Sequence, residues 1–212
     1  MKVIIPAILT NDLLDFQQKL KKVEGLSSWV QIDISDGKFT PNKTLDLKDL
    51  SSLKLKQNLE IHLMVFEPKR YFNTAEKLKA KRVIIHFEAV KENINDFFSK
   101  TYPFTLGLAL SPETPVEKVF PYLLKVNFIL ILGVTPGAQG QKFQKEVLEK
   151  IKKIKTLSPK TIVEVDGGIN ETTIKKVNQA GADIFVVGSA ILKAKEPKNL
   201  FDNLQEIVNN QS

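Results

Sequence analysis

Short apolar runs and amphipathic segments alternate along the whole chain. Eight runs rich in Val, Ile, Leu and Phe have the length of buried strands. These runs are 3–9, 29–34, 59–65, 82–88, 104–110, 126–132, 161–169 and 182–191. Eight segments with helical spacing of apolar residues follow them in turn. These segments are 11–25, 45–54, 68–79, 93–100, 116–124, 145–157, 171–181 and 197–208. Apolar strands that alternate with helices predict a parallel sheet with helical crossovers.

Eight strand–helix units predict a closed (β/α)₈ TIM barrel of the α/β class. The length of 212 residues suits this fold, which commonly takes about 200–250 residues as one domain. No linker-like or low-complexity stretch divides the chain, so we expect a single domain over residues 1–212. An open, doubly wound sheet is the alternative architecture.

Composition and charge exclude several classes of protein. Cysteine is absent, so the chain has neither a disulfide framework nor a thiolate zinc site. No run approaches the ~18 apolar residues of a membrane span, and the first apolar run is too short for a signal peptide. We therefore expect a cytoplasmic protein without a membrane partner.

The net charge of +7 arises from 31 Lys and Arg against 24 Asp and Glu. Only Arg70 and Arg82 are arginines, and the lysines are scattered among acidic residues, as in 145–155. This pattern is typical of a solvated surface rather than a nucleic-acid interface. A mildly positive field would help to recruit a small anionic substrate.

Polar residues near the ends of the predicted strands are candidates for chemistry, because barrels place function at the C-terminal ends of their strands. Asp33, His62 and Asp166 occupy such positions on three strands. Burying an aspartate in an apolar strand is costly unless it is paired or ligated. If the three side chains converge, they predict a functional site at this end of the barrel. The alternative is that the aspartates cap loops or pair with lysines. His86 and Glu88 either orient a loop or act directly in catalysis.

Glycine-rich turns follow the last three predicted strands. Their residues are Gly137, Gly140, Gly167, Gly168, Gly188 and Ser189. Glycines at these places expose backbone N–H groups at the starts of helices, and barrels frequently hold a phosphate there. We expect a phosphorylated substrate, although the same glycines could simply make tight turns.

Six segments resemble, in order and spacing, the signatures of the ribulose-phosphate 3-epimerase family. They are IPAIL (5–9), QIDISDGKFTPN (31–42), IHLMV (61–65), TPGAQGQKF (135–143), VEVDGGI (163–169) and GSAI (188–191). The resemblance implies a (β/α)₈ barrel and an isomerase that interconverts ribulose 5-phosphate and xylulose 5-phosphate. It also implies one divalent metal ion (Zn, Fe, Mn or Co) and a homo-oligomer.

The resemblance further implies roles for individual residues. Asp33 and Asp166 match the two acid/base aspartates, which also ligate the metal together with His62, while Gln31 stands where the family has another histidine ligand. The residues that match the substrate- and phosphate-binding positions are His62, Met64, Gly137, Gly140, Gly167, Gly168, Gly188 and Ser189.

Several positions depart from the family pattern. They are Ala7 for a serine, Gln31 for a histidine, Ser35 and Leu132 for methionines, and Ala138 and Gln139 for Phe and Gly. A carboxamide is a poorer zinc ligand than imidazole, although its oxygen suits a harder ion. Two alternatives stay open: a non-catalytic phosphosugar-binding relative whose metal site has decayed at Gln31, and an epimerase for a six-carbon ketose phosphate, because Ala7 and Ser35 would enlarge the pocket. A related decarboxylase or synthase would need D-x-K-x-x-D on the third strand, which EIHLMV lacks.

Overall fold

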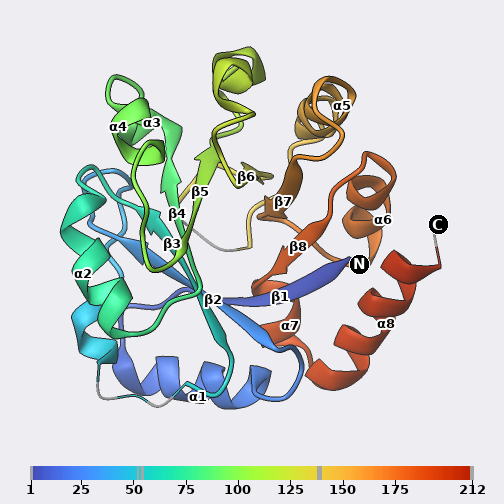
Figure 1. Cartoon of the computed structure of the whole chain (residues 1–212). Helices are drawn as coiled ribbons and strands as arrows, with labels where there is room; N and C mark the ends of the chain where they lie inside the picture. The colour runs from blue at the N-terminus through green and yellow to red at the C-terminus, as the bar shows by residue number, and fades with distance from the viewer. Residues whose placement is uncertain (1, 52, 54, 138–139, 211–212) are drawn as a thin grey trace.

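Eight parallel strands form a closed barrel in the computed structural model, which describes residues 2–51, 53, 55–137 and 140–210. The strands are β1 (Val3–Ile8), β2 (Trp29–Ser35), β3 (Asn58–Met64), β4 (Arg82–His86), β5 (Thr105–Leu110), β6 (Phe128–Leu132), β7 (Ile162–Asp166) and β8 (Ile184–Val187). Each strand pairs with the next, and β1 also pairs with β8 to close the ring (Figure 1). The predicted TIM barrel is confirmed, and the open sheet is excluded.

Helices surround the barrel on its outer side (Figure 1). The α-helices are α1 (Leu13–Val23), α2 (Lys69–Lys77), α3 (Phe87–Val90), α4 (Ile94–Phe98), α5 (Val147–Leu157), α6 (Glu171–Gln179), α7 (Ser189–Lys193) and α8 (Pro197–Asn209). The 3₁₀-helices are η1 (Leu47–Leu50) and η2 (Val116–Tyr122).

Four predicted elements differ from the structure. The strand predicted for 82–88 ends at His86, where α3 begins, and the strand predicted for 182–191 ends at Val187, before α7. The helices predicted for 45–54 and 116–124 are the 3₁₀-helices η1 and η2. In η2, Pro121 lacks the N–H that a continuous α-helix would use.

Two hydrophobic cores lie on the two sides of the sheet. Ile32 and Ile34 of β2 face the helices and join the larger core with Phe16 of α1. A smaller core inside the barrel includes Ile84 and Leu130. Along β2 the residues between the outward isoleucines therefore point into the barrel, as period-two alternation predicts.

A polar layer lies within the barrel near the N-terminal ends of its strands. Arg82 donates from Nη1 to Oε2 of Glu60 at 3.0 Å and lies 3.9 Å from Oε2 of Glu164. Its guanidinium stacks over the ring of Trp29, 4.0 Å from the centroid. Both glutamates are completely buried, so the arginine provides a counter-charge for them beneath the C-terminal rim.

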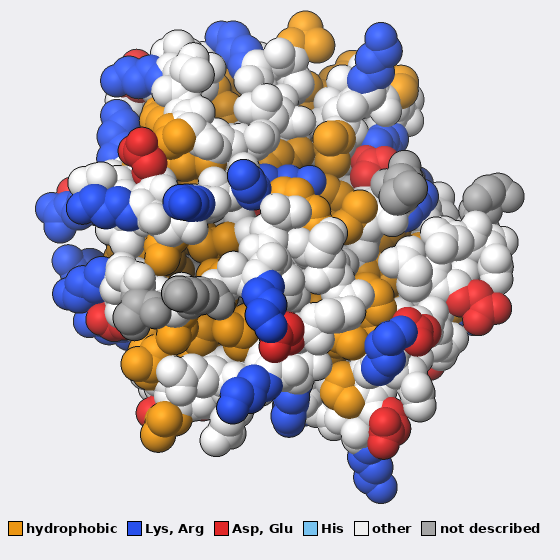
Figure 2. Space-filling view, turned by 60° about the horizontal axis from the view of Figure 1, so that its bottom comes forward, with side chains coloured by type: hydrophobic (Ala, Val, Ile, Leu, Met, Phe, Trp, Pro, Cys, Tyr) orange, Lys and Arg blue, Asp and Glu red, His pale blue; other side chains and the backbone are white. Residues whose placement is uncertain are grey.

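Lysine and arginine side chains are dispersed over the face shown in Figure 2 rather than gathered into one patch. Within the described residues, none of the helices has both the length and the apolar character needed to cross a bilayer.

Candidate functional site

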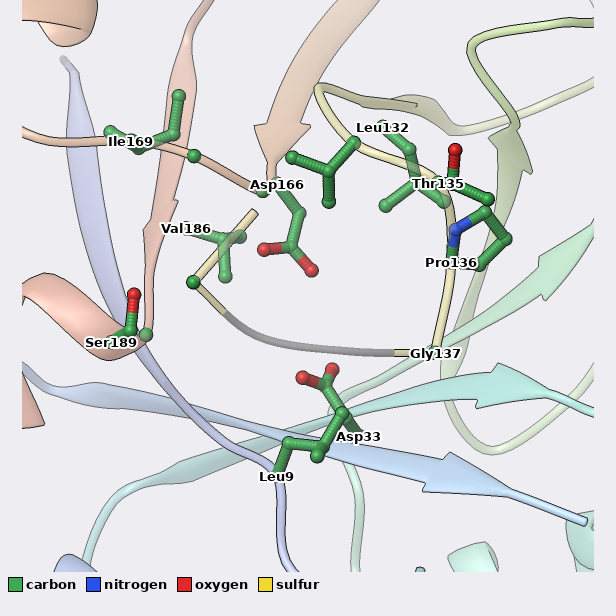
Figure 3. Close-up of a pocket in the computed structure, with 15 residues that line it drawn as sticks. Leu9, Asp33, Leu132, Thr135, Pro136, Gly137, Asp166, Ile169, Val186 and Ser189 are labelled. Carbon is green, nitrogen blue, oxygen red and sulfur yellow. The ribbon is translucent and has the colours of Figure 1, made fainter. Parts of the chain in front are cut away.

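Two aspartates and a histidine converge at the C-terminal ends of three strands. Asp33 of β2 and Asp166 of β7 extend toward one another across a pocket (Figure 3). His62 of β3 is in register with Asp33, and its Nδ1 lies 3.3 Å from Oδ1 of Asp33 and 3.5 Å from Oδ2 of Asp166. Closure of the barrel therefore brings together residues that are far apart in the sequence.

Gln31 connects the two carboxylates. Its Nε2 donates to Oδ1 of Asp33 at 2.7 Å and to Oδ2 of Asp166 at 2.9 Å. Its Oε1 is buried and accepts no hydrogen bond from any described residue. A half-turn of this amide would exchange the nitrogen and the oxygen, so Gln31 can present either a donor or an acceptor to the same place.

The buried charges perturb one another. Burial raises the pKa of Asp33, and the charge of Asp166 adds to this effect, although hydrogen bonds from His62 and Gln31 oppose it. Burial lowers the pKa of His62, but the hydrogen bonds and charges of Asp166 and Asp33 outweigh burial and raise it to about 9. Without a bound cation, the two aspartates thus favour the protonated form of the buried His62.

A series of hydrogen-bonded side chains leads from His62 away from the pocket. His62 Nε2 lies 2.9 Å from His86 Nε2, and His86 Nδ1 lies 3.3 Å from Glu88 Oε2. Burial lowers the pKa of His86 to about 4. Burial would raise the pKa of Glu88, but hydrogen bonds from His86, Thr114 and Ser111 lower it to about 2.

Neither His86 nor Glu88 lines the pocket. Glu88 Oε1 instead accepts hydrogen bonds from Ser111 N at 3.0 Å and Thr114 Oγ1 at 2.5 Å, in the loop after β5. This contact agrees with the loop-orienting alternative for the pair. The connection to His62 was not predicted, because H-x-E spacing does not show which residue the histidine meets.

The chemistry of the converging side chains suits a divalent metal ion. Asp33, His62 and Asp166 each offer one ligand atom, and these atoms lie within 4.8 Å of one another. Two carboxylates and an imidazole are ligands used for zinc and for other first-row transition metals. Oε1 of Gln31, which has no hydrogen-bond partner among the described residues, would be a further oxygen donor beside them after a half-turn of the amide. The residues therefore fit such an ion.

Six glycine-turn residues line the pocket above the aspartates. They are Gly137, Gly140, Gly167, Gly168, Gly188 and Ser189. Both Gly167 and Gly168 have positive φ, at 97° and 70°. A Cβ on Gly168 would lie 2.9 Å from the Cα of Phe143, so local packing also requires glycine there.

Met64 lies apart from the pocket lining. It is buried on β3 in register with Ser35, at the end of β2. Ser35 Oγ donates to the carbonyl of Asn42 at 2.6 Å, and this hydrogen bond stabilises the loop after β2.

The other departures lie in different surroundings. Ala7 and Leu132 belong to the inner core, and Leu132 also lines the pocket. Ala138 and Gln139 lie outside the described residues.

Comparisons with known proteins agree with these features. The model of the ribulose-phosphate 3 epimerase family matches residues 3–192. The cytoplasmic ribulose-phosphate 3-epimerase of Oryza sativa subsp. japonica is 34% identical, over 97% of this chain and 93% of the relative. The ribulose-phosphate 3-epimerase of Bacillus subtilis is 31% identical, over 95% of this chain and 97% of the relative.

Solved structures with lower sequence identity share the fold. The 3-hexulose-6-phosphate synthase of Salmonella typhimurium superposes with a TM-score of 0.72 over 100% of both chains, at 14% identity. The fold alone follows from this likeness. The family model and the full-length relatives, in contrast, show that this chain belongs to the ribulose-phosphate 3-epimerase family.

Proposed function

We propose that residues 1–212 act as one domain that interconverts ribulose 5-phosphate and xylulose 5-phosphate by proton transfer at C3. The observation that carries this proposal is the pair of carboxylates, Asp33 of β2 and Asp166 of β7, that face each other across the pocket (Figure 3). An epimerase must remove a proton from one face of a carbon and return one to the other face, and this requires two such groups.

The reaction needs one ionised and one protonated carboxyl group. The ionised aspartate takes the C3 proton, and the electron pair of the broken C–H bond moves into an enediolate spanning C2 and C3. The protonated aspartate then gives its proton to C3 from the opposite face. The two aspartates exchange roles in the reverse direction, so Asp33 and Asp166 each act as acid and as base.

His62 and Gln31 support this exchange by holding the carboxylates in place. His62 Nδ1 faces both aspartates, and both hydrogens of the Gln31 amide are directed at them. Fixing the carboxylates in advance keeps them aimed at the reacting carbon, which is a major source of catalytic rate.

Asp33, His62 and Asp166 would hold a divalent ion, and Gln31 would add Oε1 after a half-turn of its amide. When bound, such an ion supplies positive charge that stabilises the negative charge developing on the substrate oxygens. Zn²⁺, Fe²⁺, Mn²⁺ and Co²⁺ are the ions that we propose for this site.

The glycine turns after β6, β7 and β8 would bind the phosphate of the substrate. Gly137, Gly140, Gly167, Gly168 and Gly188 line the same pocket as the aspartates, together with Ser189, which begins α7 (Figure 3). A phosphate anchored there would place the ketose carbons over the aspartates. Met64, at the buried C-terminal end of β3, does not line this pocket, so we propose a supporting role for its side chain.

The test is exchange of the C3 proton of ribulose 5-phosphate in deuterated water, with and without added Mn²⁺, Fe²⁺ or Zn²⁺. We expect deuterium at C3 of both ketoses and formation of xylulose 5-phosphate. Phosphosugar binding without exchange under every metal condition would instead favour the non-catalytic relative.

Gln31 stands where the family has a histidine ligand, which favours a second candidate, a phosphosugar-binding relative that turns over no substrate. Ala7 and Ser35, which stand where the family has a serine and a methionine, favour a variant of the first candidate, an epimerase for a six-carbon ketose phosphate. A six-carbon ketose phosphate assayed in parallel distinguishes the two substrates. Preference for it over ribulose 5-phosphate would contradict our first assignment.

A further inference from the structure

The chain contains two histidines, and the structure places them in one hydrogen-bonded pair. Their rings are stacked, with centroids 5.0 Å apart and planes inclined by 17°. His62 faces the two aspartates with Nδ1, and His86 faces Glu88 with Nδ1. The two Nε2 atoms therefore meet each other, and one proton must lie between them.

The position of that proton follows from Glu88. An ionised carboxylate only accepts hydrogen bonds, and Oε1 of Glu88 already accepts from Ser111 N and Thr114 Oγ1. Oε2 must then accept from Nδ1–H of His86, because a bare Nδ1 would set two acceptors against each other at 3.3 Å. A neutral His86 with its proton on Nδ1 has a lone pair on Nε2, which accepts from Nε2–H of His62.

We propose that Glu88 is a positioning residue that acts through His86 to keep a proton on Nε2 of His62. Nδ1 of His62, the atom that faces Asp33 and Asp166, is then the nitrogen that can bind a cation. Hydrogen bonds of this kind fix the tautomer and the ring orientation of metal-binding histidines. The consequence for a bound cation rests on the function proposed above, whereas the positions of the ring protons do not.

Surrounding contacts hold this chain of groups in place. Phe39 packs against the ring of His86, with centroids 4.7 Å apart. Lys150 of α5 donates from Nζ to the carbonyls of Ser111, Pro112 and Thr114, which fixes the loop that binds Glu88. The carboxylate of Glu88 is thereby held between a rigid loop and a buried ring.

Nitrogen NMR of metal-free protein labelled with ¹⁵N-histidine tests the proposal. Two histidines give only four ring nitrogens, which the spectrum of His86→Gln assigns. We expect the wild type to carry a proton on Nδ1 of His86, none on its Nε2, and a proton on Nε2 of His62. A wild-type spectrum with Nε2 of His62 bare, and both nitrogens of His86 protonated, would overturn the proposal.

Glu88→Gln should move these protons. Its single acceptor oxygen is needed by Ser111 and Thr114, so the amide N–H groups would face Nδ1 of His86. His86 then becomes protonated on Nε2, and His62 loses its proton from Nε2. Glu88→Asp, which keeps a carboxylate, should preserve the wild-type pattern, as should Glu92→Gln, an exposed control with the same loss of charge.

Titration calorimetry with Mn²⁺ and Zn²⁺ gives a second readout. Loss of a hydrogen bond behind a metal ligand typically weakens affinity by about 10–100-fold, and we expect this range for Glu88→Gln but not for Glu92→Gln. Thr114→Val removes a loop contact of Glu88 without removing the carboxylate, so it should leave the ring protons in place. If Glu88→Gln leaves the ring protons unchanged, Glu88 does not position His62. Failure of C3 exchange alone would instead count against the proposed function.

Discussion

At the scale of single residues, Asp33 and Asp166 can be tested by replacement with the amide of the same shape. Asp33→Asn and Asp166→Asn should each lower C3 exchange by about 10²–10⁴-fold, because an amide can neither take nor give the proton. The far-ultraviolet circular dichroism should stay that of the wild type. A variant that kept more than about a tenth of wild-type turnover would show that its aspartate is not one of the two acid/base groups.

Gln31→His should raise the affinity for zinc. The position lies on the inward face of β2, two residues before Asp33, and its amide already touches both aspartates. Imidazole nitrogen binds zinc at about 2.0–2.1 Å and is a stronger ligand than a neutral amide oxygen. Calorimetric titration of both proteins with Zn²⁺ measures the gain. Equal affinities would mean that residue 31 does not occupy a ligand position.

Period-two alternation along three strands was enough to predict that Asp33, His62 and Asp166 share one rim. The direction of the Gln31 amide was not predictable, because it depends on the carboxylate of Asp166 that barrel closure brings next to it. The same reason applies to Arg82, which the sequence presents as one of two arginines and the structure places against Glu60.

At the scale of elements, the glycine turns should bind inorganic phosphate. Titration with phosphate, followed by amide NMR, should give its largest shifts at Gly167, Gly168, Gly188 and Ser189. These backbone N–H groups lie around the pocket, where anions gain from hydrogen bonds and from nearby helix starts. Shifts concentrated in the loop after β1 would contradict a phosphate site here.

The junction between β4 and α3 should contribute to stability in a way that depends on pH. Glu88 has a pKa of about 2 in the folded protein, below its ordinary value of 4.5. Its stabilising contribution is therefore complete above pH 4.5 and is lost as the pH falls toward 2. By linkage, this contribution is on the order of 3 kcal/mol near neutral pH.

Urea unfolding of the wild type and Glu88→Gln between pH 3 and 7 measures this contribution. The difference in unfolding free energy should be largest near neutral pH and should shrink in acid. Glu92→Gln should show no such trend, because its side chain is exposed. A difference that stayed constant with pH would mean that the carboxylate charge of Glu88 does not stabilise the loop after β5.

Element types were more predictable than element ends. His86 ends β4 and Phe87 begins α3, and both residues are buried. The buried run therefore continues past the end of the strand. At β8 the glycine at position 188 indicates in the sequence where the strand ends. Its backbone has φ −93° and ψ −94°, and α7 begins at the next residue. Hydrophobicity alone does not distinguish a strand from the short helix that follows it.

At the scale of the whole molecule, barrel closure was predictable because strand–helix–strand units connect in a right-handed manner and place successive strands side by side. The observed order from β1 to β8 follows the sequence order without exception. What the pattern of residues leaves open is the chemistry at the rim, since the same barrel carries a synthase in the structure from Salmonella typhimurium.

The positive charge of the molecule should make substrate capture depend on ionic strength. The net charge is +7, and the Lys and Arg side chains are dispersed over the face shown in Figure 2. A sugar phosphate carries nearly two negative charges at neutral pH, so the summed field attracts it until salt screens the interaction. The screening length falls from about 30 Å at 0.01 M salt to about 3 Å at 1 M.

We therefore expect kcat/KM for ribulose 5-phosphate to fall several-fold over this range of sodium chloride, through a rise in KM with kcat nearly constant. Potassium chloride should act equally at equal ionic strength, because screening does not depend on the identity of the cation. Sulfate should inhibit more strongly than chloride at the same ionic strength, since it can also occupy the phosphate-binding turns. A kcat/KM that did not change with chloride would show that the net charge plays no part in capture and that recognition lies entirely in the pocket.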